Sequence, residues 1–257
     1  MNFTGKASPL NQGGLEASTG FLDIDPARIW TVLSVETSGV GFLADKRPKI
    51  LFERHVFSRL TGHKYDESHP GISNLQSGGY GPSGSYQYER LIEAASLDND
   101  AALQSASWGI GQIMGFNYNA AGFASVAEMV SAMADSESAQ LVAMAKFLKG
   151  RGLDTPLMKR DWAAFAKRYN GPDYSKNDYD KKLAAFYAKY SQGNLPDLDV
   201  RAAQLFLLYL GFDPGPVDGM IGNRTLAALN AFLKTQGKPQ TSSVTSGILE
   251  LLRNQAA

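Results

Sequence analysis

The chain has 257 residues, among them 25 lysines and arginines, 25 aspartates and glutamates, three histidines and no cysteine. This length suits one large domain or two modest ones. The absence of cysteine excludes a disulfide scaffold, a thiol nucleophile and a cysteine-ligated metal. A net charge of zero argues against nucleic acid or an anionic membrane as a partner held by bulk charge.

No stretch of the sequence approaches the roughly 18–20 apolar residues that a membrane span requires. The residues after Met1 also lack the apolar segment of a secretory signal peptide. We therefore expect a monomer that is made in the cytoplasm, carries no signal peptide and does not insert into a membrane.

The first predicted helix begins at Asp25-Pro26 and ends at Ser38-Gly39, because aspartate caps a helix and proline suits its first turn. A short strand is predicted at 49–54, where side chains alternate between two faces. A loop rich in glycine, serine, asparagine and proline follows at 69–84.

Helical periodicity dominates the next hundred residues. Helices are expected at 85–97, 99–107, 125–134, 137–149, 156–169 and 176–190. Ser125 with Glu128 predicts a capping box, and Thr155-Pro156 predicts a second helix start. Since only one region has strand character, the predicted fold is mainly α with a small β insertion.

The strongest break in composition lies at 191–197, where glycine and then proline separate two helical patterns. We therefore predict a domain at 1–195 and a second one at 196–257. The second reads as three helices, expected at 198–210, 223–236 and 243–254.

Glu36 is the first candidate for chemistry. It shares one helix face with Ile29 and Leu33, at spacings of i, i+4 and i+7. Burial and the negative end of the helix dipole both raise the pKa of a carboxyl group, which would make Glu36 a proton donor near neutral pH. The alternative is a glutamate whose carboxylate reaches solvent from the helix end.

Glu53 follows in the predicted strand and is the second candidate. Glycoside hydrolysis uses two carboxyl groups that flank one bond, one as the acid and the other as base or nucleophile. A glutamate at a helix end and one on a strand could supply that pair. The alternative is a structural ion pair with Arg54 or Arg59.

Two further motifs are weak when each is taken alone. Ser107-Trp108-Gly109-Ile110-Gly111-Gln112-Ile113-Met114 reads as a glycine-rich turn, and Tyr169-Asn170-Gly171 as a helix end. Glu36-Thr37-Ser38 precedes both motifs in the chain. Taken together in this order, the three motifs resemble those of the lysozyme-like superfamily, which includes the soluble lytic transglycosylases. The segments 46–57, 85–91 and 106–115 resemble more specifically the N-acetylmuramidase domain of modular phage endolysins.

This resemblance covers about residues 22–190 and implies a lysozyme-like α+β catalytic domain. It makes Glu36 the catalytic acid and places Gln112, Tyr169 and Asn170 near a sugar-binding groove. Ser38, His55 and Tyr86, which lie in or beside the same motifs, are further candidates for substrate binding. The implied substrate is bacterial peptidoglycan, reached after another protein has permeabilised the host membrane.

Residues 198–236 resemble a three-helix peptidoglycan-binding module, through Val200–Leu205, Leu210–Gly219 and Ile221–Thr225. Asp218-Gly219 is expected to form a turn. Arg224 and Thr225 open the second helix, whose free N–H groups could hold a peptide carboxylate. We expect mainly structural roles for Asp218 and Gly219 and a mixed one for Arg224.

No His-Glu-x-x-His motif and no paired histidines on a helix face are present, so a zinc enzyme is poorly supported. Neither a metal nor another cofactor is expected. Three functions remain: hydrolysis of the bond between N-acetylmuramic acid and N-acetylglucosamine, lytic transglycosylation of that bond, and wall binding without catalysis. Glu53 favours the first, since a transglycosylase needs no second carboxylate.

Overall fold

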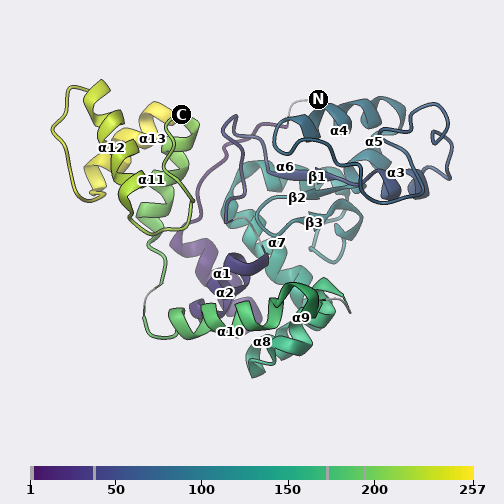
Figure 1. Cartoon of the computed structure of the whole chain (residues 1–257), viewed down its shortest axis with the longest axis horizontal. Coiled ribbons are helices and arrows are strands. Elements are labelled where there is room, and N and C mark those ends of the chain that lie inside the picture. The colour runs from purple at the N-terminus through teal and green to yellow at the C-terminus, as the bar shows by residue number, and fades with distance from the viewer. Residues whose placement is uncertain (1–2, 37–38, 172–173, 194) are drawn as a thin grey trace.

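The computed structural model describes residues 3–36, 39–171, 174–193 and 195–257. Figure 1 shows a large helical body and, beside it, a smaller bundle formed by the last helices of the chain. The helices of the body are α1 (Gln12–Leu22), α2 (Pro26–Glu36), α3 (Arg54–Leu60), α4 (Tyr86–Leu97), α5 (Asn99–Gln104), α6 (Val126–Asp135), α7 (Glu137–Gly150), α8 (Asp154–Lys159), α9 (Trp162–Asn170) and α10 (Tyr179–Tyr190). Two 3-10 turns, η1 (Gly115–Asn117) and η2 (Tyr174–Asn177), lie between them.

The sheet is small and antiparallel. Its order is β1 (Ile50–Phe52), β2 (Ala106–Trp108) and β3 (Ile113–Met114). Ile50 faces Trp108 across the first pair, and Ser107 faces Met114 across the second. The predicted strand at 49–54 is thus confirmed over three of its residues.

The prediction of a helix over 99–107 is wrong at its end, and so is the prediction of a single strand region. Helix α5 ends at Gln104, after which Ala106–Trp108 form the central strand. Alanine and serine have no strong preference for strand, so local sequence favoured the helix. Pairing with β1 on one side and β3 on the other decides the outcome in the fold.

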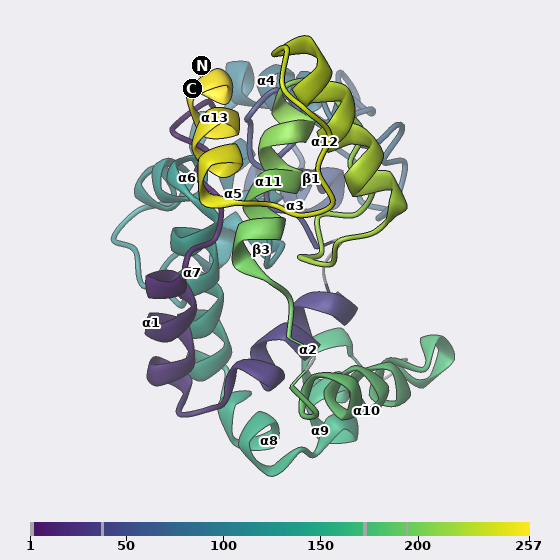
Figure 2. The same cartoon turned by 90° about the vertical axis from the view of Figure 1, so that its left-hand side faces the viewer.

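Two helices were not predicted, α1 and α3. Asn11 caps α1 by accepting a hydrogen bond of 2.9 Å from the amide of Gly14. Three glycines weaken the helical signal of α1, yet Gly14 is needed there: a Cβ on it would lie 2.4 Å from the Cβ of Ser138 on α7. Figure 2 shows α1 lying alongside α7, so packing stabilises a helix that its own composition disfavours.

The predicted helix at 156–169 is two helices in the structure. Arg160 adopts a left-handed conformation with φ of 58°, and Asp161 caps α9 through the amide of Ala164. Helix α8 begins at Asp154, so Thr155 is not its cap. The helices predicted at 85–97, 125–134 and 137–149 are confirmed, and Ser125 caps α6 as expected.

One hydrophobic cluster fills the body, and it surrounds the sheet. Phe52, Tyr88 and Trp108 are fully buried in it, together with Ile29 of α2. Tyr88 and Trp108 are thus core residues. Their polar atoms are satisfied internally, because Tyr88 donates to the carbonyl of Pro48 and Trp108 to that of Leu103.

The bundle consists of α11 (Leu198–Tyr209), α12 (Asn223–Thr235) and α13 (Ser246–Ala256), close to the three helices predicted there. It has its own hydrophobic cluster, which includes Leu207, Leu229 and Leu252. A third, smaller cluster joins Ala7 and Phe42 of the body to Leu205 and Val217 of the bundle. Among the residues described, none of the helices is long and apolar enough to cross a membrane.

Candidate active site

Glu36 is the last residue of α2, at the negative end of the helix dipole. The apolar stripe that leads to it is confirmed, since Ile29 and Leu33 are both buried. The helix is also held by Ser34, whose hydroxyl lies 2.7 Å from that of Tyr190 on α10. Ser38, a predicted substrate-binding residue, lies outside the described ranges.

Gly41, five positions after Glu36, is fixed by buried polar groups. Its amide donates to Oε1 of Glu137 at 2.9 Å, and its carbonyl accepts from the amide of Lys49 at 2.8 Å. A Cβ at this position would lie 1.9 Å from Oε1 of Gln140. Only glycine fits here, because the side chain of Gln140 lies too close to the backbone for a Cβ. Lys49, which bonds to Gly41, directly precedes the strand that leads to Glu53.

Glu53 follows β1 directly and occupies the N-cap position of α3, although its side chain makes no capping hydrogen bond. Its carboxylate is turned elsewhere: Oε1 accepts a hydrogen bond of 3.2 Å from the hydroxyl of Tyr80. Oε2 lies 3.2 Å from Nδ1 of His55, outside hydrogen-bond geometry, and neither atom has a hydrogen-bond partner. The side chain of Glu53 is 15% exposed, and the oxygen without a hydrogen-bond partner, Oε2, is its buried one.

The alternative in which Glu53 pairs with Arg54 or Arg59 does not match these contacts. The Nε of Arg54 donates to the carbonyl of Gln76, and the guanidinium of Arg59 lies 5.6 Å from the ring centre of Phe116. Within the described part of the chain, the basic side chain paired by distance with Glu53 is His55.

The loop that carries Tyr80 is held in place by two buried residues of α4. Gln87 donates to the carbonyls of Tyr80 and Pro82 and accepts from the amide of Phe52. Arg90 donates to the carbonyls of Phe52 and Tyr80. Neither side chain was singled out from the sequence, although both lie in the 85–91 motif. Together they fix the end of β1, and with it Glu53, against the loop.

Two partly exposed tyrosine rings belong to this region: Tyr80, which contacts Glu53, and Tyr86, which lies close to Gly81. Tyr86 opens α4, and its Cε1 atom would lie 2.6 Å from a Cβ on Gly81, which has a φ of 64°. Burial, followed by the negative charge of Glu53, raises the pKa of Tyr80. Tyr80 therefore remains a hydrogen-bond donor at neutral pH, and the two rings are available for stacking on sugars.

Gln112 lies in the turn between β2 and β3, with a left-handed φ of 45°. Its amide is engaged within the protein: Oε1 accepts from Ser107, and Nε2 donates to the carbonyls of Lys49 and Gly109. The flanking glycines allow close packing, because a Cβ on Gly109 would lie 2.6 Å from Gln140. Gln112 thus shapes the turn and ties it to the start of β1.

Tyr169 lies beside the same turn, since its hydroxyl donates to the carbonyl of Gly111 at 3.3 Å. Its ring stacks on Phe165 with centroids 5.5 Å apart. Gln112, Arg168 and Tyr169 are among the residues that line a hollow of about 540 Å³. Asn170 is the last residue of α9. The structure therefore forms two groups of predicted site residues: Gln112 and its neighbours lie beside Lys49, just before β1, and Glu53 lies just after β1.

In the loop after α3, Nδ1 of His63 lies 3.5 Å from Oδ2 of Asp66. Asp66 accepts hydrogen bonds from Ser58 and Ser73, and the Ser73 contact contributes most to lowering the pKa of Asp66. Across residues 3–36, 39–171, 174–193 and 195–257, no cluster of three or more His, Cys, Asp or Glu side chains could hold a metal ion.

The polar residues of the bundle converge on Gln204, which is buried. Gln204 accepts from the amides of Asp218 and Gly219 and donates to the side chains of Asp218 and Thr225. Arg224, by contrast, is exposed and pairs with Asp213. The expected structural roles of Asp218 and Gly219 fit this network, and Thr225 shares that role, whereas the Arg224 side chain faces solvent.

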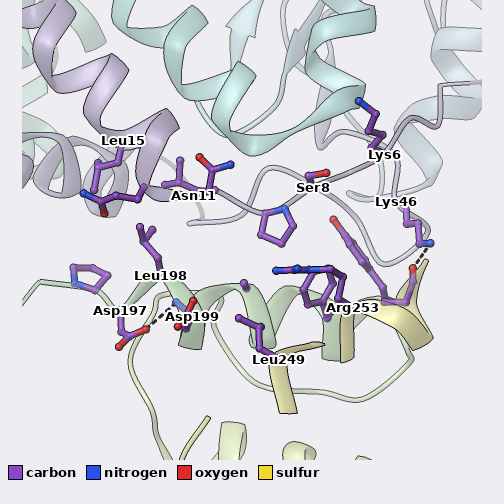
Figure 3. A pocket seen from close by; sticks show the side chains of 18 of the residues that line it. Lys6, Ser8, Asn11, Leu15, Lys46, Asp197, Leu198, Asp199, Leu249 and Arg253 are labelled. Atoms are coloured by element: carbon purple, nitrogen blue, oxygen red, sulfur yellow. Dashed lines mark hydrogen bonds between the residues drawn. The ribbon is translucent and has the colours of Figure 1, made fainter. Parts of the chain in front are cut away.

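A hollow of about 960 Å³ separates the body from the bundle (Figure 3). Its walls come from the N-terminal segment, which includes Leu10 and Asn11, and from bundle residues such as Leu249. At one end Lys46 donates to the carbonyls of Ala256 and Ala257. The hollow is thus closed at that end by a contact between the two parts of the chain.

A family model and a solved structure both match a large part of this chain. Residues 25–191 match the model of the family described as N-acetylmuramidase. The crystal structure of the Burkholderia AP3 phage endolysin is 37% identical, with a TM-score of 0.68, over 72% of this chain and 72% of that one. A Nostoc punctiforme protein described as "Putative OxPP cycle protein OpcA" is 30% identical over 100 residues, which is 33% of this chain and only 22% of that protein.

Proposed function

Because the chain belongs to the N-acetylmuramidase family, we propose that it hydrolyses the glycosidic bond between N-acetylmuramic acid and N-acetylglucosamine in bacterial peptidoglycan. The observation that carries this proposal is the environment of Glu53. A carboxylate that is largely buried, accepts a hydrogen bond from the partly exposed Tyr80 and has one buried oxygen without a hydrogen-bond partner suits a group that is held in place to act on substrate.

In the proposed reaction, protonated Glu36 gives its proton to the glycosidic oxygen as the bond from that oxygen to the sugar C1 breaks. Glu53 either takes a proton from the water that attacks C1 or attacks C1 itself before water releases the sugar. The hydroxyl of Tyr80 orients the Glu53 carboxylate. His55, Tyr86, Gln112, Tyr169, Asn170 and Ser38 are proposed to bind or border the glycan.

We assign residues 196–257 to wall binding and residues 1–195 to catalysis. The exposed Arg224, at the start of α12, is the residue of the bundle best placed to meet a peptide carboxylate. The likeness to a phage endolysin supports action on a bacterial cell wall. We propose further that the protein acts on the host wall from within, as a monomer, after the membrane has been permeabilised.

The test is digestion of purified peptidoglycan by the wild type, Glu36→Gln and Glu53→Gln, with mass spectrometry of the products. Hydrolysis yields muropeptides with reducing ends, and Glu36→Gln should abolish their release while wall sedimentation still removes the variant from solution. Anhydro-muramic products would instead establish the transglycosylase, and full lysis by Glu36→Gln would remove Glu36 from the mechanism.

The stereochemistry of the product distinguishes the two possible roles of Glu53, as nucleophile or as base. Proton NMR of the first reducing ends distinguishes retention, in which the carboxylate attacks C1, from inversion, in which it activates water. If Glu53→Gln keeps wild-type turnover, Glu53 has no part in either step.

A further inference from the structure

The bundle contacts the chain on both sides of Glu36. Six positions before it, Trp30 of α2 lies under Arg201 of α11, with the guanidinium carbon 5.9 Å from the ring centre. Five positions after it, Gly41 donates to the carboxylate of Glu137, and Arg201 donates to the same oxygen at 2.7 Å. One side chain of the bundle is therefore linked to both segments that flank the proposed acid.

The ion pair at this contact is fully enclosed. Arg201 is 1% exposed and Glu137 is completely buried. Glu137 is the first residue of α7, where the helix dipole favours a carboxylate, and its other oxygen accepts from the amide of Leu10. Since a buried charge is tolerated only when it is paired, each partner depends on the other.

Apolar packing follows the same path. Phe42, next to Gly41, is buried with Leu205 and Val217 of the bundle, and Val40 packs against this cluster. Arg201 also donates to the carbonyl of Val217, which joins the apolar contact to the ion pair. The stretch from Gly39 to Phe42 is thus positioned by the bundle as much as by the body.

We propose that Arg201 is a positioning residue for the catalytic acid. Docking of the bundle through Arg201 and Glu137 fixes the segments before and after Glu36 and so sets where Glu36 meets the substrate. This inference rests on the proposed function, in which Glu36 donates the proton. Its consequence is that the bundle contributes to turnover even on substrates that it does not have to bind.

The experiment uses the full chain and soluble, uncross-linked glycan strands, on which targeting to an insoluble wall has no effect. Arg201→Met should lower kcat by about tenfold or more while KM changes by less than about twofold, because small misplacements of a catalytic group lower the rate steeply. Amide hydrogen exchange at residues 39–42 should accelerate in the same variant. Arg253→Met, at an exposed arginine of α13 in the same bundle, is the matched control and should leave kcat and this exchange unchanged.

Leu205→Ala is the second variant, because it loosens the same contact without leaving a buried charge unpaired. It should reproduce the fall in kcat and the faster exchange. If Arg201→Met does not fold, Leu205→Ala alone tests whether docking of the bundle positions Glu36. Wild-type kcat and wild-type exchange at 39–42 in a folded Arg201→Met or Leu205→Ala would overturn the inference. Failure of the wild type to cleave the strands would overturn the proposed function, whereas the exchange measurement would still report on docking.

Discussion

The hydroxyl of Tyr80 donates a hydrogen bond of 3.2 Å to the carboxylate of Glu53, across 27 positions of sequence. This contact joins a residue from the glycine-rich loop to the carboxylate that follows β1. It gives Glu53 a fixed orientation, which a group at the edge of a helix would otherwise lack.

Tyr80→Phe should therefore lower kcat for glycan cleavage by about tenfold, the usual effect of removing one hydrogen bond to a charged group. The ring remains, so KM should change little. Steady-state kinetics on soluble glycan strands measure both constants. An unchanged kcat would mean that the orientation of Glu53 does not depend on Tyr80.

Glu53→Gln should lower the pKa of Tyr80 without returning it to the ordinary value. Burial is the largest cause that raises this pKa, and the negative charge of Glu53 and its hydrogen bond to Tyr80 follow, so the substitution leaves the largest cause in place. Absorbance at 295 nm during alkaline titration, with Tyr80→Phe subtracted, measures the shift. A pKa of Tyr80 that is the same in Glu53→Gln and the wild type would contradict the contact.

Stability should decline above about pH 10, and Tyr88 should account for part of that decline. Burial raises the pKa of Tyr88 well above its ordinary value of 10.0, so the unfolded chain loses this proton at a lower pH than the folded chain. The contribution of Tyr88 is complete below pH 10 and is lost as the pH rises through the folded value. Urea denaturation between pH 8 and 11 should show a shallower decline in Tyr88→Phe, while Tyr86→Phe, at an exposed ring, should follow the wild type.

Gly41→Ala should destabilise the protein by about 1–3 kcal/mol, the usual cost of forcing an extra carbon into a packed site. The added Cβ would lie 1.9 Å from Oε1 of Gln140. Gly20→Ala in α1 is the matched control, because nothing lies within 4 Å of its added Cβ. That substitution should stabilise the helix by about 0.5–1 kcal/mol. Thermal denaturation compares the two, and equal melting temperatures would contradict the close approach at Gly41.

Gln204→Leu and Arg224→Gln should separate folding from binding in the bundle. The first leaves the amides of Asp218 and Gly219 without their acceptor, and an unsatisfied buried group such as the Gly219 amide costs about 1–3 kcal/mol. The second removes an exposed side chain and should leave the free energy of unfolding unchanged while weakening sedimentation with cell walls. Normal wall binding by Arg224→Gln would place the wall contact elsewhere on the bundle.

The sequence predicts well what local chemistry decides. Capping residues and apolar periodicity locate α6, α7 and the start of α2 to within a residue or two. The stripe of Ile29 and Leu33 correctly indicates a buried helix face that leads to Glu36. The resemblance in three motifs agrees with the family match over residues 25–191.

What the sequence could not predict depends on contacts between distant residues. Strand β2 exists because Ala106–Trp108 pair with β1, and α1 contains glycines that serve its packing against α7. Glu137 and Arg201 read as surface charges on helices, yet they meet in the interior. Gln87 and Arg90 likewise look like ordinary polar positions until the carbonyls of Phe52 and Tyr80 are seen beside them.

The buried pair also orders events in time during synthesis. Arg201 lies 64 positions after Glu137, so at about 5–20 residues per second it is added about 3–13 seconds later. During that interval the Glu137 carboxylate has no cation to accompany it into the interior. We therefore expect the buried contact around Gly41 to form only after Arg201 has been made, so that docking of the bundle is a late step of folding.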